Sequence, residues 1–205
     1  KREYERMLRE EQRNVLISSC CPTVNLLIQK YFPSLLPDLA EILSPMLAHG
    51  ADLKRRHPGA KVVFVGPCLS KMDEAASYPG MIDAVLTFAD LTRWLASAGV
   101  PLEKGLDTTQ KSRAFPTTGG ILKSMDLNAP GYAYMAIDGA ENCIAALRDI
   151  EKGSIDHCFV EMSACVGSCI SGPVMEKYHR SPIRDTAAVI RYTGSEDFDV
   201  AQPAP

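Results

Sequence analysis

The chain has 205 residues, of which 46% are hydrophobic and 23% charged, so it can bury one large core or the cores of two small lobes. Its formal net charge of -3 gives no basic stripe for nucleic acid, and no apolar run approaches the roughly 20 residues of a membrane span. Composition therefore predicts a globular protein with neither a nucleic-acid nor a membrane partner.

Cysteine usage is the first functional signal. The seven cysteines are an odd number, and four of them form two tight groups, Cys20-Cys21 and Cys165/Cys169. This pattern is typical of reduced thiols that serve metal or redox chemistry, so we expect a cytoplasmic protein and not a disulfide framework. Because the chain starts at Lys1, without Met and inside a charged helical pattern, we expect it to be a piece of a longer protein.

The first cysteine pair follows the first predicted strand. Residues 1–12 are dense in charge and predict a solvated helix, and residues 15–17 predict a short buried strand. The strand runs directly into Cys20-Cys21-Pro22, where Pro22 suits the first turn of a helix. Both cysteines should therefore lie near a helix N-terminus, where free N–H groups and the helix dipole favour a thiolate.

A third cysteine follows the second predicted strand. Residues 35–57 form a helical pattern that Pro45 should kink or split. Residues 61–65 predict a buried strand, and Gly66-Pro67-Cys68 lies at its carboxyl end, before a predicted helix. Open α/β sheets bind ligands at such strand-to-helix corners.

The remaining pattern continues the alternation of strands and helices. We expect Trp94 to have a packing role and not a functional one, on one side of an amphipathic helix that leads into a loop over residues 99–110. The other expected elements are strands at 82–87, 132–137 and 157–162 and helices at 88–98, 121–125, 139–151 and 186–192. This order predicts an α/β fold with mostly parallel sheet and flanking helices, in one domain over residues 1–193 with a tail or linker over 194–205.

The last strand delivers Cys165 and Cys169, and these two sulfurs can point into one space if the first helical turn begins there. With Cys21 and Cys68 they could hold one 4Fe–4S cubane. Zinc competes, because four thiolates also suit a tetrahedral site. The common alternative for any single cysteine is a small buried hydrophobe, which we assign to the two isolated ones, Cys143 and Cys158.

Three stretches together resemble the signature motifs of a known family. They are Ser18-Ser19-Cys20-Cys21-Pro22, then Gly66-Pro67-Cys68-Leu69-Ser70-Lys71-Met72-Asp73-Glu74, then Glu161-Met162-Ser163-Ala164-Cys165-Val166-Gly167-Ser168-Cys169. In this order they are similar to the catalytic domain of the iron-only (FeFe) hydrogenases. Phe115-Pro116-Thr117-Thr118-Gly119-Gly120 and residues 82–87 also resemble parts of that domain, so we expect a partial version of its fold.

The resemblance implies an H-cluster, a 4Fe–4S cubane joined to a two-iron unit that carries carbon monoxide, cyanide and a dithiolate bridge. It implies reversible H2 oxidation and proton reduction, with an electron carrier such as ferredoxin or a fused iron–sulfur domain as partner. By position, the cubane ligands would be Cys21, Cys68 and Cys165, together with Cys169 as the bridging ligand. Cys20 would pass protons, Lys71 would hydrogen-bond a cyanide, and Glu74 would support Lys71.

The chain also departs from the catalytic members. Gly66 and Ser163 replace methionines beside the two-iron unit, and Ala40 stands where a relay serine is usual, although Ser44-Pro45 is kept. We expect four residues to surround the cluster without binding it: Gly66, Ser163, Ser44 and Phe115. The changes resemble the sensory branch of the family, which implies slow turnover, H2 sensing and fused signalling modules. The alternative is a cubane-only iron–sulfur protein with an assembly or redox role.

Overall fold

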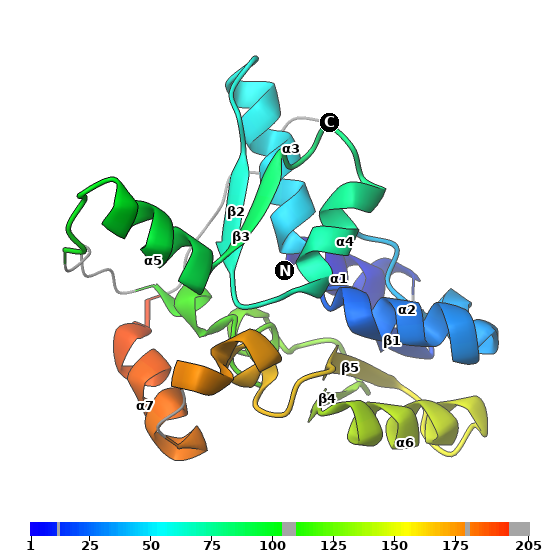
Figure 1. Cartoon of the computed structure of the whole chain (residues 1–205). Coiled ribbons are helices and arrows are strands. Elements are labelled where there is room, and N and C mark those ends of the chain that lie inside the picture. Colours follow the sequence, from blue (N-terminus) through cyan, green and yellow to red (C-terminus); the bar gives the residue numbers. More distant parts are fainter. Residues whose placement is uncertain (12, 104–109, 179–180, 197–205) are drawn as a thin grey trace.

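The computed structural model describes residues 1–11, 13–103, 110–178 and 181–196. It contains two parallel sheets (Figure 1). One has three strands in the order β1 (Val15–Ile17), β5 (Cys158–Ser163) and β4 (Ala133–Asp138), and the other pairs β2 (Val63–Gly66) with β3 (Ala84–Thr87). The predicted α/β class with parallel sheet and flanking helices is confirmed, and the strands divide between two lobes.

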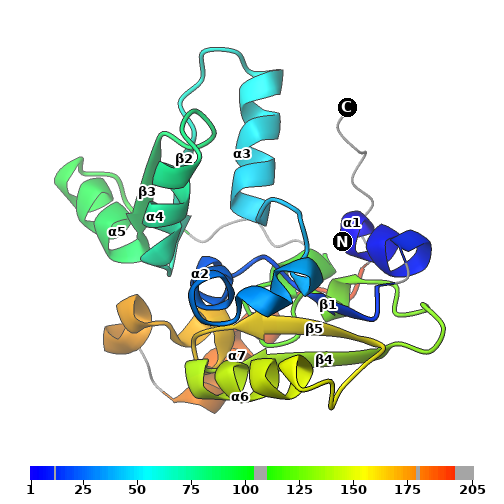
Figure 2. The ribbon, with the colours of Figure 1, turned by 90° about the vertical axis from the view of Figure 1, so that its right-hand side faces the viewer.

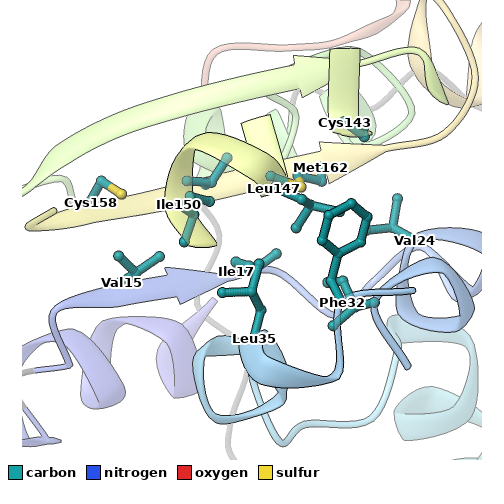
Figure 3. Close-up of a cluster of buried hydrophobic side chains, with 12 residues drawn as sticks. Val15, Ile17, Val24, Phe32, Leu35, Cys143, Leu147, Ile150, Cys158 and Met162 are labelled. Carbon is teal, nitrogen blue, oxygen red and sulfur yellow. The ribbon is translucent and has the colours of Figure 1, made fainter. Parts of the chain in front are cut away.

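The first lobe is built around β5, whose residues Cys158 to Met162 are all buried. Its alternate side chains serve two cores. Val160 and Met162 pack with Ile17 against α2 (Pro22–Tyr31) and α6 (Ala140–Glu151). Figure 3 shows Ile17 and Met162 among the side chains of this core. Phe159 faces the opposite core. Each large apolar side chain buried in this way contributes about 1.5–3 kcal/mol.

The second lobe holds β2 and β3 with α3 (Pro45–Arg56), α4 (Ser70–Ser77) and α5 (Phe88–Ser97), and stands apart from the three-stranded sheet in Figures 1 and 2. Its buried cluster is small: Met46, Leu47, Val62 and Ile82. The strand predicted at residues 61–65 is present as β2, but Val63 is 44% exposed, so the prediction that the strand is buried is wrong. Two strands offer each other little cover, which explains the exposure.

The N-terminal segment forms α1 (Arg2–Arg6) and a π-helical turn, Met7–Glu11. The expected solvated helix is only half correct, because Tyr4, Met7 and Leu8 are buried against the Phe159 core. Glu3 remains at the surface and pairs with Arg6. The prediction missed this apolar face because charged residues outnumber apolar ones in the segment.

The pattern predicted as one kinked or split helix over residues 35–57 is split. A 3-10 helix spans Pro33–Asp38, and the backbone N–H of Ala40 then donates to Ile17 as the chain runs on toward α3. Pro45 is the first residue of α3, and the Ser44 hydroxyl caps it by accepting the Leu47 N–H at 3.4 Å. Pro45 therefore begins a helix and kinks none.

Trp94 is 61% exposed, so its predicted packing role is wrong. The last helix, α7 (Pro182–Tyr192), begins earlier than the predicted residue 186, with Ser181 as its cap. Short 3-10 helices span Lys111–Ala114, Leu122–Ser124, Ser168–Ser171 and Pro173–Tyr178.

Parts of two predictions, residues 104–109 of the expected loop and 197–205 of the expected tail, lie outside the described residues. The division at residue 193 therefore stays a prediction. In the part of the chain that the structure describes, no helix has both the length and the apolar character needed to cross a membrane.

Candidate metal centre

The three cysteine-bearing corners meet at one cavity of about 570 Å³, and four thiols line it: Cys21, Cys68, Cys165 and Cys169. Cys21 is the N-cap residue of α2, and Cys68 lies between β2 and α4. The other two follow β5, which pairs in parallel with β1, so the carboxyl ends of these strands lie at one edge. The cavity therefore receives ligand candidates from both lobes.

A second cavity of about 330 Å³ adjoins the first. Its walls share three of the thiols, Cys21, Cys68 and Cys169, and add Cys20 and Lys71. The six residues to which sequence reasoning gave direct roles are therefore brought together around two adjoining cavities.

A tight turn presents Cys165 and Cys169. Gly167 has a φ of 77° and Ser168 has a φ of 57°. Both values lie in the left-handed region, which residues other than glycine rarely adopt. The Ser168 N–H donates to the Cys165 carbonyl at 2.9 Å, and its hydroxyl lies 2.6 Å from that of Ser163. A left-handed reversal at Gly167 and Ser168 leads into the 3-10 helix Ser168–Ser171, which carries Cys169, so a helical turn does begin here, but only after the reversal.

The Cys68 thiol joins a hydrogen-bond chain between the lobes. Its Sγ lies 3.1 Å from the Ser70 hydroxyl oxygen, which accepts a hydrogen bond from Thr23 of α2 at 3.0 Å. Because Thr23 donates, the Ser70 proton is available for the sulfur. This chain of contacts links the Cys68 sulfur to α2 in the first lobe.

Burial raises the pKa of the Cys20 thiol to about 12, with the neighbouring Cys21 as the next cause. Burial likewise raises the pKa of Cys169 to about 12, ahead of the nearby Cys21, Cys68 and Cys165. Gathered thiolates therefore need a compensating positive charge, which iron supplies when it binds sulfur.

Lys71 carries a nearly buried cation into the second cavity. Its Nζ donates to the Cys20 carbonyl at 3.2 Å and to Glu74 Oε2 at 2.6 Å, and the two side chains are 12% and 8% exposed. An ammonium group has three donors, so these two contacts leave one for an anionic ligand in the cavity. Glu74 fixes the position of the amine, as expected for a supporting residue.

Gly66 is buried against the Phe64 ring. A Cβ at Gly66 would lie 2.6 Å from that ring, closer than side chains tolerate. Phe64 itself lines the second cavity. An aromatic ring therefore fills space at the position where the catalytic hydrogenases, by the resemblance, carry a methionine.

The remaining predicted site residues have different positions. Ser163 lines both cavities, and Phe115 lines the second cavity while staying 37% exposed. Ser44 lines neither, because its hydroxyl caps α3. Its influence on the cluster stays a prediction.

Sequence reasoning missed the role of Glu161. This carboxylate is buried, lines the second cavity and accepts the N–H groups of Ile121 and Leu122 at 3.1 Å each. Burial raises the pKa of Glu161 although both hydrogen bonds favour the ionised form. The sequence did carry a signal for this role, because Glu161 is a charged residue inside an apolar strand and lies shortly before Cys165.

The donor set fits an iron–sulfur cluster better than one ion. Thiolates on tetrahedral zinc lie about 3.8 Å apart, given a Zn–S bond of about 2.3 Å. Among the described residues, no three His, Cys, Asp or Glu side chains converge as a single ion requires. A cubane binds each thiolate at a different iron, which suits four soft donors spread around one cavity.

Comparison with known proteins gives relatives of one kind. Iron hydrogenase 1 of Clostridium pasteurianum is 24% identical over 214 residues, an alignment that covers 77% of this chain and 37% of that protein. The periplasmic [Fe] hydrogenase large subunit of Nitratidesulfovibrio vulgaris is 26% identical over 216 residues, covering 77% of this chain and 51% of the relative. The chain thus spans about a third to a half of their length.

Solved structures share the fold. A [FeFe]-hydrogenase studied for oxygen inactivation of its H cluster superposes with a TM-score of 0.66 at 17% identity, over 96% of this chain and 71% of its own. A variant of the HydA1 [FeFe]-hydrogenase of Chlamydomonas reinhardtii gives 0.67 at 17% identity, over 92% and 68%. Residues 1–130 and 123–173 match the model of the iron only hydrogenase large subunit, C-terminal domain, and the chain therefore belongs to that family.

Proposed function

We propose that the chain binds an H-cluster and catalyses reversible H2 oxidation and proton reduction. One observation carries the proposal. Four thiols line a single cavity, and a thiol and a nearly buried ammonium group stand in the adjoining one. A cubane needs only the four thiols, whereas a two-iron unit with anionic ligands also has a use for the additional thiol and the ammonium group.

In this proposal Cys21, Cys68, Cys165 and Cys169 would hold the cubane, and Cys169 would be the thiolate shared with the two-iron unit. The bound cluster supplies the redox chemistry of H2. Lys71 would use its remaining donor to hold a cyanide ligand, while Glu74 keeps the amine in place by their 2.6 Å ion pair.

Cys20 moves the proton at its Sγ, which lies 3.8 Å from the Ser18 hydroxyl. Because burial raises its pKa, the thiol holds its proton at neutral pH and is a weak acid there, so it gives the proton up only transiently. The thiolate left behind is destabilised by burial, so it takes up the next proton readily.

We further propose slow turnover in an H2 sensor. Gly66 and Ser163 stand at the two positions where the resemblance implies methionines, and Ala40 has no hydroxyl for a proton relay and is buried in the core with Tyr4. The electron carrier would be a ferredoxin or a fused iron–sulfur domain, and the readout would lie in signalling modules of a longer cytoplasmic protein.

One observation favours a second candidate, a cubane-only iron–sulfur protein. The Phe64 ring fills the space beside Gly66 in the cavity that the two-iron unit would occupy. A cubane alone needs neither the Cys20 proton relay nor a cyanide partner at Lys71. These two residues therefore separate the candidates by experiment.

The test is infrared spectroscopy and an H2 assay of protein loaded anaerobically with a cubane and a synthetic two-iron cofactor. We expect carbonyl and cyanide bands together with turnover. Cys20→Ala should keep the iron content and lose turnover, while the control Cys158→Ala, in a buried cysteine that lines neither cavity, should keep both. A brown protein without carbonyl bands or turnover would favour the cubane-only candidate.

The rate has its own test. Loaded in the same way and assayed beside Clostridium pasteurianum iron hydrogenase 1, this chain should turn over H2 at a clearly lower rate. An equal rate would contradict the sensory assignment and leave H-cluster binding intact.

A further inference from the structure

Asp138 joins two segments that surround the cluster cavities. It ends β4, directly opposite Ser163 in the parallel register, so its carboxylate stands where the loop to Cys165 begins. Its Oδ2 accepts the Gly167 N–H at 2.9 Å and the Thr118 hydroxyl at 2.5 Å. Sequence reasoning gave this residue no role.

The turn that Asp138 holds cannot be stable for local reasons alone. Gly167 lies midway between Cys165 and Cys169, and it is followed by the left-handed Ser168. Glycine adopts that region freely but a serine rarely does, so contacts from outside the turn help to hold the backbone at Ser168. The hydrogen bond from Gly167 to Asp138 is such a contact, because it comes from the neighbouring strand of the well-packed first lobe.

The same carboxylate oxygen reaches the wall of the second cavity. Thr118 belongs to the loop of residues 115–120, and Phe115 and Pro116 of this loop line that cavity. Asp138 therefore ties the cavity wall to the turn that carries both thiols. The negative charge of Asp138 also lies next to this turn. A negative charge beside an iron–sulfur cluster favours the oxidised form of the cluster.

We propose that Asp138 is a positioning residue for the cluster: its hydrogen bond to Gly167 sets the direction of the Cys165 and Cys169 thiols, and its charge lowers the cluster's reduction potential. The inference rests on the proposed iron–sulfur site. The two parts separate experimentally, because the amide of asparagine can still accept the Gly167 hydrogen bond but carries no charge.

The test compares the full chain, Asp138→Asn and Asp138→Ala after anaerobic reconstitution of the cubane, with Asp149→Asn on α6 as the charge-removal control. Asp138→Ala should change the electron paramagnetic resonance signal of the reduced cluster and speed iron loss to a chelator. Asp138→Asn should restore both properties and keep a more positive midpoint potential. Potentials and spectra like those of the unmodified chain in both Asp138 variants would overturn the proposal.

A metal-free measurement keeps the inference separate from the proposed function. Amide exchange followed by NMR should show Gly167 exchanging at least about tenfold faster in Asp138→Ala, and near the unmodified rate in Asp138→Asn. Unchanged exchange in Asp138→Ala would overturn the positioning role. If the unmodified chain takes up no iron, the proposed function fails, and the Gly167 amide still decides whether Asp138 holds the turn.

Discussion

Strands β5 and β2 both deliver cysteines to the same cavity, but the molecule supports them unequally. β5 is the central strand of three and is buried from Cys158 to Met162, whereas β2 has one partner strand and leaves Val63 44% exposed. Stability in proteins is local, so the lobe that carries Cys68 and Lys71 should open more readily than the lobe that carries Cys165 and Cys169. A cluster bound by cysteines of both lobes would therefore connect the weakly packed second lobe to the well-packed first lobe.

Removal of the second lobe's only candidate ligand should have the largest effect. Cys68→Ala leaves three thiols on the first lobe, and we expect loss of stable iron binding and of the brown colour. Iron analysis after anaerobic reconstitution measures this, with Cys158→Ala as the control. Equal iron content in the two variants would show that Cys68 holds no cluster.

Core truncation should then separate the two lobes by stability. Phe159→Ala removes a fully buried ring, and we expect it to lower the free energy of unfolding by about 3–5 kcal/mol. Val63→Ala in β2 should cost less than about 1 kcal/mol, because that side chain is 44% exposed. Urea denaturation of metal-free protein followed by circular dichroism measures both. Similar losses would contradict the contrast in packing.

The ion pair at the cavity gives a smaller effect. Glu74→Ala leaves the nearly buried Lys71 ammonium without its carboxylate partner and with only the Cys20 carbonyl as acceptor, so we expect the free energy of unfolding to fall by about 1–3 kcal/mol. The exposed pair of Arg6 with Glu3 is the control, and Glu3→Ala should cost less than about 1 kcal/mol. In loaded protein Glu74→Ala should also shift the cyanide infrared bands. Unmoved bands would mean that Lys71 does not contact the cofactor.

The smallest expected effect is a pH dependence from Glu161. Burial raises its folded pKa above the ordinary 4.5, so the protonated carboxyl favours the fold. This contribution is complete below about pH 4.5 and is lost as the pH rises through the folded pKa. Glu161→Gln can keep the acceptor for Ile121 and Leu122 but does not titrate. The stability of the unmodified chain relative to this variant should fall as pH rises, and a constant difference would refute the assignment.

Much of the framework was predictable from local patterns. The short apolar run at residues 15–17, followed by Cys21-Pro22, predicted a strand and a helix start, because proline tolerates the first helical position. Cys143 and Cys158 were predicted to be buried and are. The grouping of Cys21 with Cys165 and Cys169 was also predictable, since parallel strands end at one edge, whereas Cys68 follows a strand of the other sheet.

Other features depend on long-range packing that no local pattern reports. The exposure of Val63 and Trp94 follows from a sheet of only two strands. The left-handed Ser168 is held through the Ser163 hydroxyl and the neighbouring turn, and Asp138 joins segments about 20 and 30 residues away in sequence. A spacing of four between cysteines suggested a helical turn, and the 3-10 helix Ser168–Ser171 is there, but the left-handed reversal before it could not be predicted from the spacing.

Hydrogen exchange of the two sheets, with and without a reconstituted cubane, tests the central claim most directly. The claim is that one cluster joins both lobes through Cys68 on one side and Cys21, Cys165 and Cys169 on the other. We predict that cluster loading slows amide exchange in β2 and β3 much more than in β1, β5 and β4. Unchanged exchange in β2 and β3, in protein shown to carry the cubane, would contradict it.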